Sequence, residues 1–152
     1  MGWSCVRRDS AVDSQAMDYV FCEPLNLILT TVREVEATDD IRSFHRRLMT
    51  DPGVPPSARE LVDLRKLARL DVDVQAIQDI ASIEAGQARR IGTAQIAVVA
   101  TLPAAFGMGR MYQMLSSGSQ AKVSVFPALG PALAWLGVTV EEIRRHVPGF
   151  EP

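Results

Sequence analysis

Charged and aromatic side chains near the ends of predicted strands are the groups in this sequence that could hold a ligand. A guanidinium matches the geometry of a carboxylate or phosphate, and apolar side chains give a small-molecule site its floor. A cleft lined by Arg65, Arg110, Met111 and Tyr112 therefore suits a small carboxylate or a lipid headgroup. The candidate ligand-binding residues are Asp63, Arg65, Thr101, Arg110 and Tyr112.

A second interpretation of the same residues needs no ligand. Asp63 and Arg65 point to opposite faces if their strand continues through both, and each could pair with a neighbouring surface charge. Met111 and Tyr112 could belong to the core or to a dimer surface. The sequence favours this second interpretation, because motif matches without structural context are often accidental.

Several common chemistries have no motif here. His45 and His146 lack a second ligand at metal spacing, and Cys22 lies beside Glu23, whose charge disfavours a thiolate. The chain has neither a Gly-x-Ser-x-Gly elbow nor a Gly-Lys-Ser/Thr phosphate loop, and Gly107-Met-Gly109 lacks the third glycine of a dinucleotide fingerprint. We therefore predict no catalytic residue, no metal site, no cofactor and no enzymatic activity.

Composition indicates an ordinary globular domain. The 152 residues are 47% hydrophobic and 22% charged, and their net charge of −2 gives no field that would recruit nucleic acid. No stretch approaches the roughly 20 apolar residues of a membrane span, and Arg7 and Arg8 precede no signal-peptide core. Two cysteines make no disulfide framework, so we expect a cytoplasmic protein. Residues 1–17 are predicted to be a disordered tail, with Met17 a possible natural start, and residues 18–152 to be one domain.

The stretch from Ala94 to Leu115 predicts the centre of the fold. Ile96 to Ala100 are apolar without alternation, which is typical of a strand covered on both faces. Pro103 can begin a helix, because a first-turn residue needs no intrahelical N–H bond. The further predicted strands are 19–22, 27–35, 60–65 and 122–126, and the further helices are near 38–49, 74–83, 131–136 and 139–147.

Helix-capping residues support these assignments. Thr38 and either Asp71 or Asp73 are candidate N-caps, and Thr139 with Glu142 has the spacing of a capping box. The resulting order, β-β-α-β-α-β-α-β-α-α, predicts an α/β fold. We expect a mainly parallel sheet of about five strands, with an N-terminal antiparallel hairpin strand and helices packed on it.

Five short motifs lie on these predicted elements: Glu60-Leu-Val-Asp-Leu-Arg65, Ala97-Val-Val-Ala100, Phe106-Gly-Met-Gly-Arg-Met-Tyr112, Val123-Ser-Val-Phe126 and Ala132-Leu-Ala-Trp-Leu-Gly137. Together with the element order, they resemble the SpoIIAA-like (STAS/SEC14-type) family of small bacterial proteins, from about Tyr19 to Val138. Many members of that family have no assigned function. Others are anti-sigma-factor antagonists that bind a kinase, or domains that cradle lipids.

The resemblance also implies where a phosphorylation switch would lie. The antagonists carry a phosphorylatable serine in the turn after their third strand, and Asp73 takes the place of that serine here. A serine kinase cannot modify a carboxylate, so no phosphorylation site is expected. Asp73 could mimic a phosphoserine, but the simpler interpretation is an N-cap.

Two functions follow as hypotheses. The first is a non-enzymatic interaction or regulatory module that binds a protein partner or forms a homodimer, with Phe106 and the methionines at 108, 111 and 114 as an adaptable apolar surface. The second is a small-ligand or lipid binder with a cleft near the carboxyl ends of the parallel strands. An apolar cavity would favour the second hypothesis, and a filled core with an exposed Met/Phe patch would favour the first.

Overall fold

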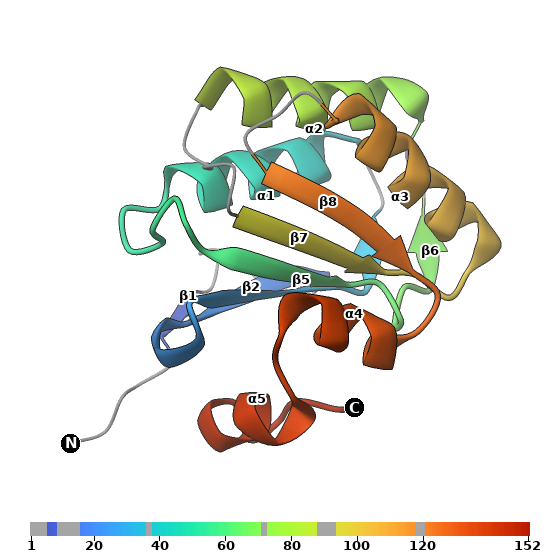
Figure 1. Cartoon of the computed structure of the whole chain (residues 1–152). Coiled ribbons are helices and arrows are strands. Elements are labelled where there is room, and N and C mark those ends of the chain that lie inside the picture. Colours follow the sequence, from blue (N-terminus) through green and yellow to red (C-terminus); the bar gives the residue numbers. More distant parts are fainter. Residues whose placement is uncertain (1–5, 9–15, 36–37, 71–72, 88–93, 118–120) are drawn as a thin grey trace.

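A computed structural model describes residues 6–8, 16–35, 38–70, 73–87, 94–117 and 121–152 of the chain. Its main element is a six-stranded sheet in the order β1-β2-β3-β5-β7-β8, with helices on both faces (Figure 1). The strands are β1 (Val6–Arg8), β2 (Met17–Cys22), β3 (Leu27–Val32), β5 (Arg59–Asp63), β7 (Ala94–Val99) and β8 (Ala121–Phe126). The helices are α1 (Thr38–Thr50), α2 (Val74–Gln87), α3 (Pro103–Leu115), α4 (Leu129–Leu136) and α5 (Val140–His146).

The N-terminal strands form the antiparallel part of the sheet. β2 pairs antiparallel with β3, which confirms the predicted hairpin, and β1 pairs antiparallel with β2 as a strand that the sequence did not predict. The turn between β2 and β3 is a 3-10 helix, η1 (Glu23–Leu25), and Asn26 closes it with φ 47° and ψ 47°, a conformation that asparagine tolerates. β1 lies within the segment predicted as a tail, and β2 begins at its last residue, Met17, so part of that segment belongs to the sheet.

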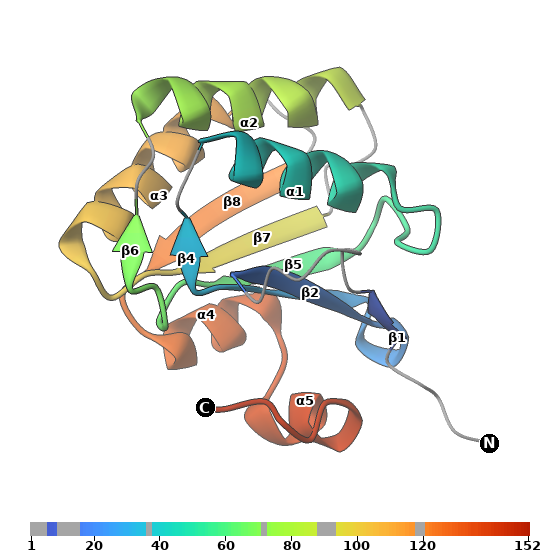
Figure 2. The same cartoon turned by 180° about the vertical axis from the view of Figure 1, so that it is seen from behind.

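The remaining strands are parallel, which places the connecting helices on one face. β5 pairs with β3, β7 with β5, and β8 with β7, so each new strand is added on the same side. Right-handed crossovers in one direction keep their helices on one face of the sheet. α1, α2 and α3 accordingly lie together on one face, and α4 and α5 lie on the other (Figures 1 and 2).

Two predicted strands end earlier than the sequence suggested. The strand predicted over 27–35 breaks at Arg33, and β4 (Glu34–Val35) pairs in parallel with β6 (Arg69–Leu70) as a separate two-stranded sheet. The strand predicted over 60–65 ends at Asp63, because the Asp63 carboxylate accepts a hydrogen bond from the backbone N–H of Arg65 at 3.0 Å. Such an Asx turn competes with the strand ladder.

The two faces of the sheet have separate cores. Leu61 and Val99 face α4 and α5 and pack with Leu133, Leu136 and Ile143. Gly137 ends α4 with φ 74°, and Thr139 and Glu142 form the predicted capping box of α5. These contacts fill the α4–α5 face.

On the other face, α2 contacts its neighbouring helices more than it contacts the strands. α2 lies between α1 and α3 and farther from the sheet than either helix (Figure 1). Arg42 of α1 bonds to Asp79 of α2 and, at 2.9 Å, to Asp39 of its own helix. This ion pair ties α1 to α2 above the sheet.

Replacing Asp79 by Asn should reduce stability and its dependence on acid pH. A hydrogen bond from Gln75, and then the Arg42 guanidinium, hold the pKa of Asp79 below its ordinary value. A carboxyl with a lowered folded-state pKa stabilises the protein above its unfolded pKa of about 3.9, and the stabilisation disappears as pH falls through the folded value. Urea unfolding between pH 7 and pH 3 should show a shallower loss of stability in Asp79→Asn than in the wild type. Equal slopes would contradict this role.

Candidate functional site

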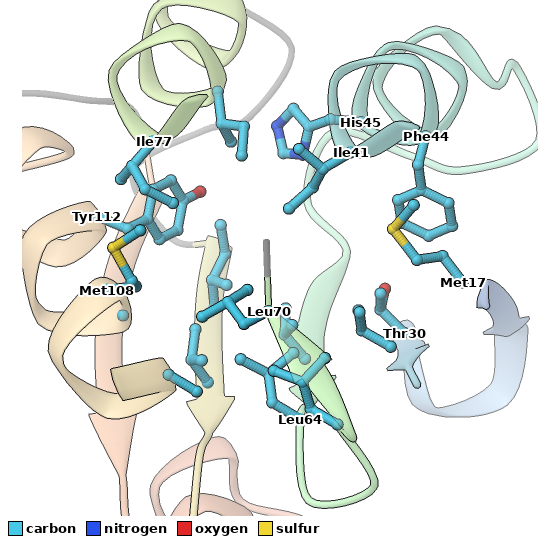
Figure 3. Close-up of a pocket in the computed structure, with 18 of the residues that line it drawn as sticks. Met17, Thr30, Ile41, Phe44, His45, Leu64, Leu70, Ile77, Met108 and Tyr112 are labelled. Atoms are coloured by element: carbon cyan, nitrogen blue, oxygen red, sulfur yellow. The ribbon is translucent and has the colours of Figure 1, made fainter. Parts of the chain in front are cut away.

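An apolar cavity of about 130 Å³ lies between the sheet and the three crossover helices. The strands supply its floor, α1, α2 and α3 supply its roof, and leucines near β6 close one side (Figure 3). The cavity exists because α2 rests on its neighbouring helices rather than on the strands below it. The strand residues that form the floor are Met17, Thr30, Val32, Glu60, Val62, Ile96 and Val98.

A buried carboxylate interrupts this apolar floor. Glu60 is 4% exposed and Thr30 is 3% exposed, and the Thr30 hydroxyl donates a hydrogen bond of 2.7 Å to Glu60 Oε1. Glu60 lies on β5 between Ile28 of β3 and Ile96 of β7 in the sheet register. The cavity therefore has one strongly polar position in its floor, set among branched aliphatic side chains.

Strand alternation explains why Glu60 faces the cavity. Successive side chains of a strand point to opposite faces, so Leu61 and Asp63 of β5 face α4 and α5. Glu60 and Val62 then face α1, α2 and α3, where both line the cavity. Sequence reasoning placed Glu60 at the start of this strand without assigning it a role. The sequence signal that could have revealed this role is an acidic residue at the start of an otherwise apolar strand.

The roof contributes two further polar side chains. His45 of α1 and Tyr112 of α3 line the cavity, and Figure 3 shows the Tyr112 hydroxyl directed toward the space that His45 borders. Both residues, together with Ile41, remain partly exposed. Their partial exposure marks the part of the lining that is nearest to solvent.

A cavity and a buried acid are both unfavourable for stability. Protein interiors are normally close-packed, and apolar side chains that line an unfilled space lack the dispersion contacts of a filled core. Removing a carboxylate from water also has a cost that its partners must offset. An apolar cavity with a buried carboxylate in its floor departs from ordinary core packing, and such departures often occur at functional sites.

The sequence-predicted candidates Asp63 and Arg65 pair with each other. Arg65 Nε and Nη2 donate to the two carboxylate oxygens of Asp63 at 2.9 and 2.8 Å. The hydrogen bond to Asp63 raises the pKa of Arg65. Arg65 Nη2 also donates to the backbone oxygen of Glu151 at 2.7 Å, and Lys66 forms an ion pair with the Glu151 side chain. Asp63 and Arg65 would point to opposite faces only if the strand continued through both, and β5 ends at Asp63.

The other three candidates lie elsewhere. Thr101 is exposed between β7 and α3, and Arg110 is exposed on α3, where its Nη1 donates to Gln113 at 3.2 Å. Of the five candidates, Tyr112 is the one that lines the cavity. Asp63 and Arg65 therefore contact each other, whereas Tyr112 belongs to the lining of the cavity.

Asp73 and Cys22 are two further residues that the sequence singled out. Asp73 Oδ1 accepts a hydrogen bond of 2.9 Å from the N–H of Ala76, which is the geometry of an N-cap for α2. Cys22 is fully buried.

Within the part of the chain that the structure describes, no three histidine, cysteine or acidic side chains come together as a metal ion would require. No helix in the described ranges has the length and apolar composition to cross a membrane.

The comparisons with known proteins show a structural likeness but no matching family model or curated protein. A similar solved structure is an uncharacterized protein of the DUF3478 family with a SpoIIAA-like fold, from Shewanella loihica PV-4. It is 12% identical, covers 88% of this chain and 92% of its own, and superposes with a TM-score of 0.45. That neighbour has the fold that the sequence resemblance implied.

Proposed function

We propose that this protein is a non-catalytic binding domain whose ligand is a small, mainly apolar molecule held in the cavity beneath α1, α2 and α3. The coincidence of the cavity with the buried Glu60–Thr30 pair supports the proposal most directly. Small-molecule sites are typically apolar pockets with a few placed polar groups. A cavity of about 150 Å³ lined by aliphatic and aromatic side chains can bind benzene, so the volume here suits a molecule with one ring.

An interaction module has less support from the exposed surface. Of the residues expected to form an adaptable apolar surface, Phe106 packs against the core and Met108 lines the cavity. Met114 is 70% exposed and Leu115 is 44% exposed, both at the end of α3. Two neighbouring apolar side chains form a smaller patch than protein interfaces usually need.

Filling the cavity should abolish binding of a simple apolar probe. Toluene should cause saturable shifts in the methyl NMR signals of Ile77, Ile96 and Val98, which line the cavity. A Val62→Phe variant places a ring in the same volume, and its affinity for toluene should fall at least about 100-fold, because an occupied cavity loses the apolar contact area. The shifts in Val62→Phe should be absent at the concentrations that saturate the wild type.

A matched control is available on the opposite face. Val140 of α5 packs with the α4–α5 core, so Val140→Phe makes the same chemical change away from the cavity and should leave toluene binding unchanged. Native mass spectrometry of the freshly purified protein should also reveal a bound small molecule that Val62→Phe lacks. Cavity methyl signals that stay unchanged at saturating toluene, with no co-purified molecule, would contradict the proposal.

A further inference from the structure

We propose a second binding site at the carboxyl ends of β3 and β5, which takes an acidic peptide segment of a protein partner. The chain's own residues Phe150 and Glu151 occupy this site in the structure, so they act as an internal competitor for it. Its basic residues are Arg33, in the loop after β3, and Arg65 and Lys66, in the loop after β5. None of these residues lines the cavity, so the inference is independent of the proposed apolar ligand.

The carboxylate of Glu151 lies among the three cations of this site. Lys66 Nζ is 2.7 Å from Glu151 Oε2. The hydrogen bond from Lys66 lowers the pKa of Glu151, and the positive charges of Arg65 and Arg33 lower it further. The two loops leave neighbouring parallel strands, at the edge where α/β sheets bring ligand-binding residues together. The position therefore favours an ionised carboxylate.

Two arginines also bind the backbone of the segment that carries Glu151. Arg65 Nη2 donates to the backbone oxygen of Glu151 at 2.7 Å, and Arg144 Nε donates to the backbone oxygen of Phe150 at 3.1 Å. Phe150 packs against the α4–α5 core, and this end of the chain lies on the α4–α5 side of the sheet (Figure 2). Successive backbone oxygens, an apolar side chain and a carboxylate belong to a peptide and not to a free anion. The site therefore matches an acidic residue that follows a large apolar one.

The internal segment is held weakly enough for another peptide to displace it. The side chains of Lys66 and Glu151 are 46% and 68% exposed, and an ion pair between such exposed groups contributes little to stability. A segment of the same chain nevertheless has a high effective concentration at its site. A weak internal contact is therefore sufficient to lower the apparent affinity for an external peptide.

The test uses the acetylated peptide Val-Pro-Gly-Phe-Glu-Pro, which copies residues 147–152, in an NMR titration of the whole chain. Glu151→Gln removes the charge of the internal competitor and keeps the size of its side chain. This variant should bind the peptide about 2- to 5-fold more tightly than the wild type does, because its own segment competes less. A second peptide with glutamine in place of the glutamate should bind the variant at least about 2-fold more weakly than the first.

Lys66 is the cation to remove, because Arg65 also pairs with Asp63. Lys66→Met in the Glu151→Gln background should abolish the preference for the peptide with glutamate. Lys122 lies exposed on the edge strand β8, so Lys122→Met makes the same change of charge away from the site and should keep that preference.

Three results would overturn the inference. The first is equal affinity of Glu151→Gln for the two peptides, or no detectable binding of either. The second is acetate that shifts the same signals at the same concentrations as the peptide, since a free anion would then be the ligand. The third is a wild-type dimer that Lys66→Met dissociates, because residues 150–151 of a second copy would then occupy the site. Each result leaves the toluene titration of the cavity unaffected.

Discussion

Replacing Thr30 by Val together with Glu60 by Met should raise the free energy of unfolding by about 1–4 kcal/mol. Replacing a buried polar or ionic pair by apolar groups of similar volume is often neutral or stabilising, because both partners escape their desolvation cost. Thr30 and Glu60 are 3% and 4% exposed, so both side chains are almost fully desolvated in the folded protein. Urea unfolding at pH 7 measures the effect.

The single variants should behave differently from the pair. Thr30→Val removes the hydroxyl that donates to Glu60 Oε1, and it should lower stability by about 1.5–3 kcal/mol, the range for hydrogen bonds to charged groups. The two substitutions should therefore be strongly non-additive, as expected for residues in direct contact. A double variant less stable than the wild type would mean that the pair is a structural element. The predicted gain would show that Glu60 is kept at the expense of stability, as functional residues often are.

The fold was largely predictable because its signals are local. The apolar stretch before Ala100, the proline at the start of α3 and the capping box at Thr139 each predict one element, and crossover handedness then fixes the arrangement. The ends of β3 at Val32 and of β5 at Asp63 were not predicted. β5 ends because the Asp63 carboxylate accepts a hydrogen bond from the backbone N–H of Arg65, two residues away. That bond competes with a ladder that the apolar pattern alone would continue.

The cavity could not be predicted for a different reason. Its volume depends on how far α2 lies from the sheet, and the sequence of α2 shows only an apolar face. Predicting that Glu60 faces the cavity required knowing which face of β5 meets α1, α2 and α3 rather than α4 and α5, and strand alternation alone gives two equivalent choices. Tyr112 was chosen as a ligand residue and does line the cavity, whereas the rule that ligands gather at strand ends placed the predicted cleft elsewhere.

Replacing Arg65 by Met should lower the free energy of unfolding by about 2–3 kcal/mol. Breaking a fully buried ion pair by removing one partner costs about 3–5 kcal/mol, because the other charge is left without compensation. The Arg65 and Asp63 side chains retain 20% and 11% of their exposed area, so water reduces the effect. The backbone N–H of residue 65 continues to donate to Asp63, which limits the loss further. Chemical denaturation at pH 7 gives the difference.

Arg110→Met is the matched control and makes the experiment informative about function. Arg110 is exposed and bonds only to Gln113 in the contacts that the structure gives for its side chain, so its replacement should change stability by less than about 0.5 kcal/mol. If the ligand occupies the cavity beneath α1, α2 and α3, both variants should bind toluene as the wild type does, because neither Arg65 nor Arg110 lines that cavity. A loss of toluene affinity in Arg65→Met, with the fold intact, would return the ligand site to the strand ends. A loss of stability in Arg65→Met without a loss of ligand affinity would show that Arg65 supports the fold and that the ligand binds in the cavity.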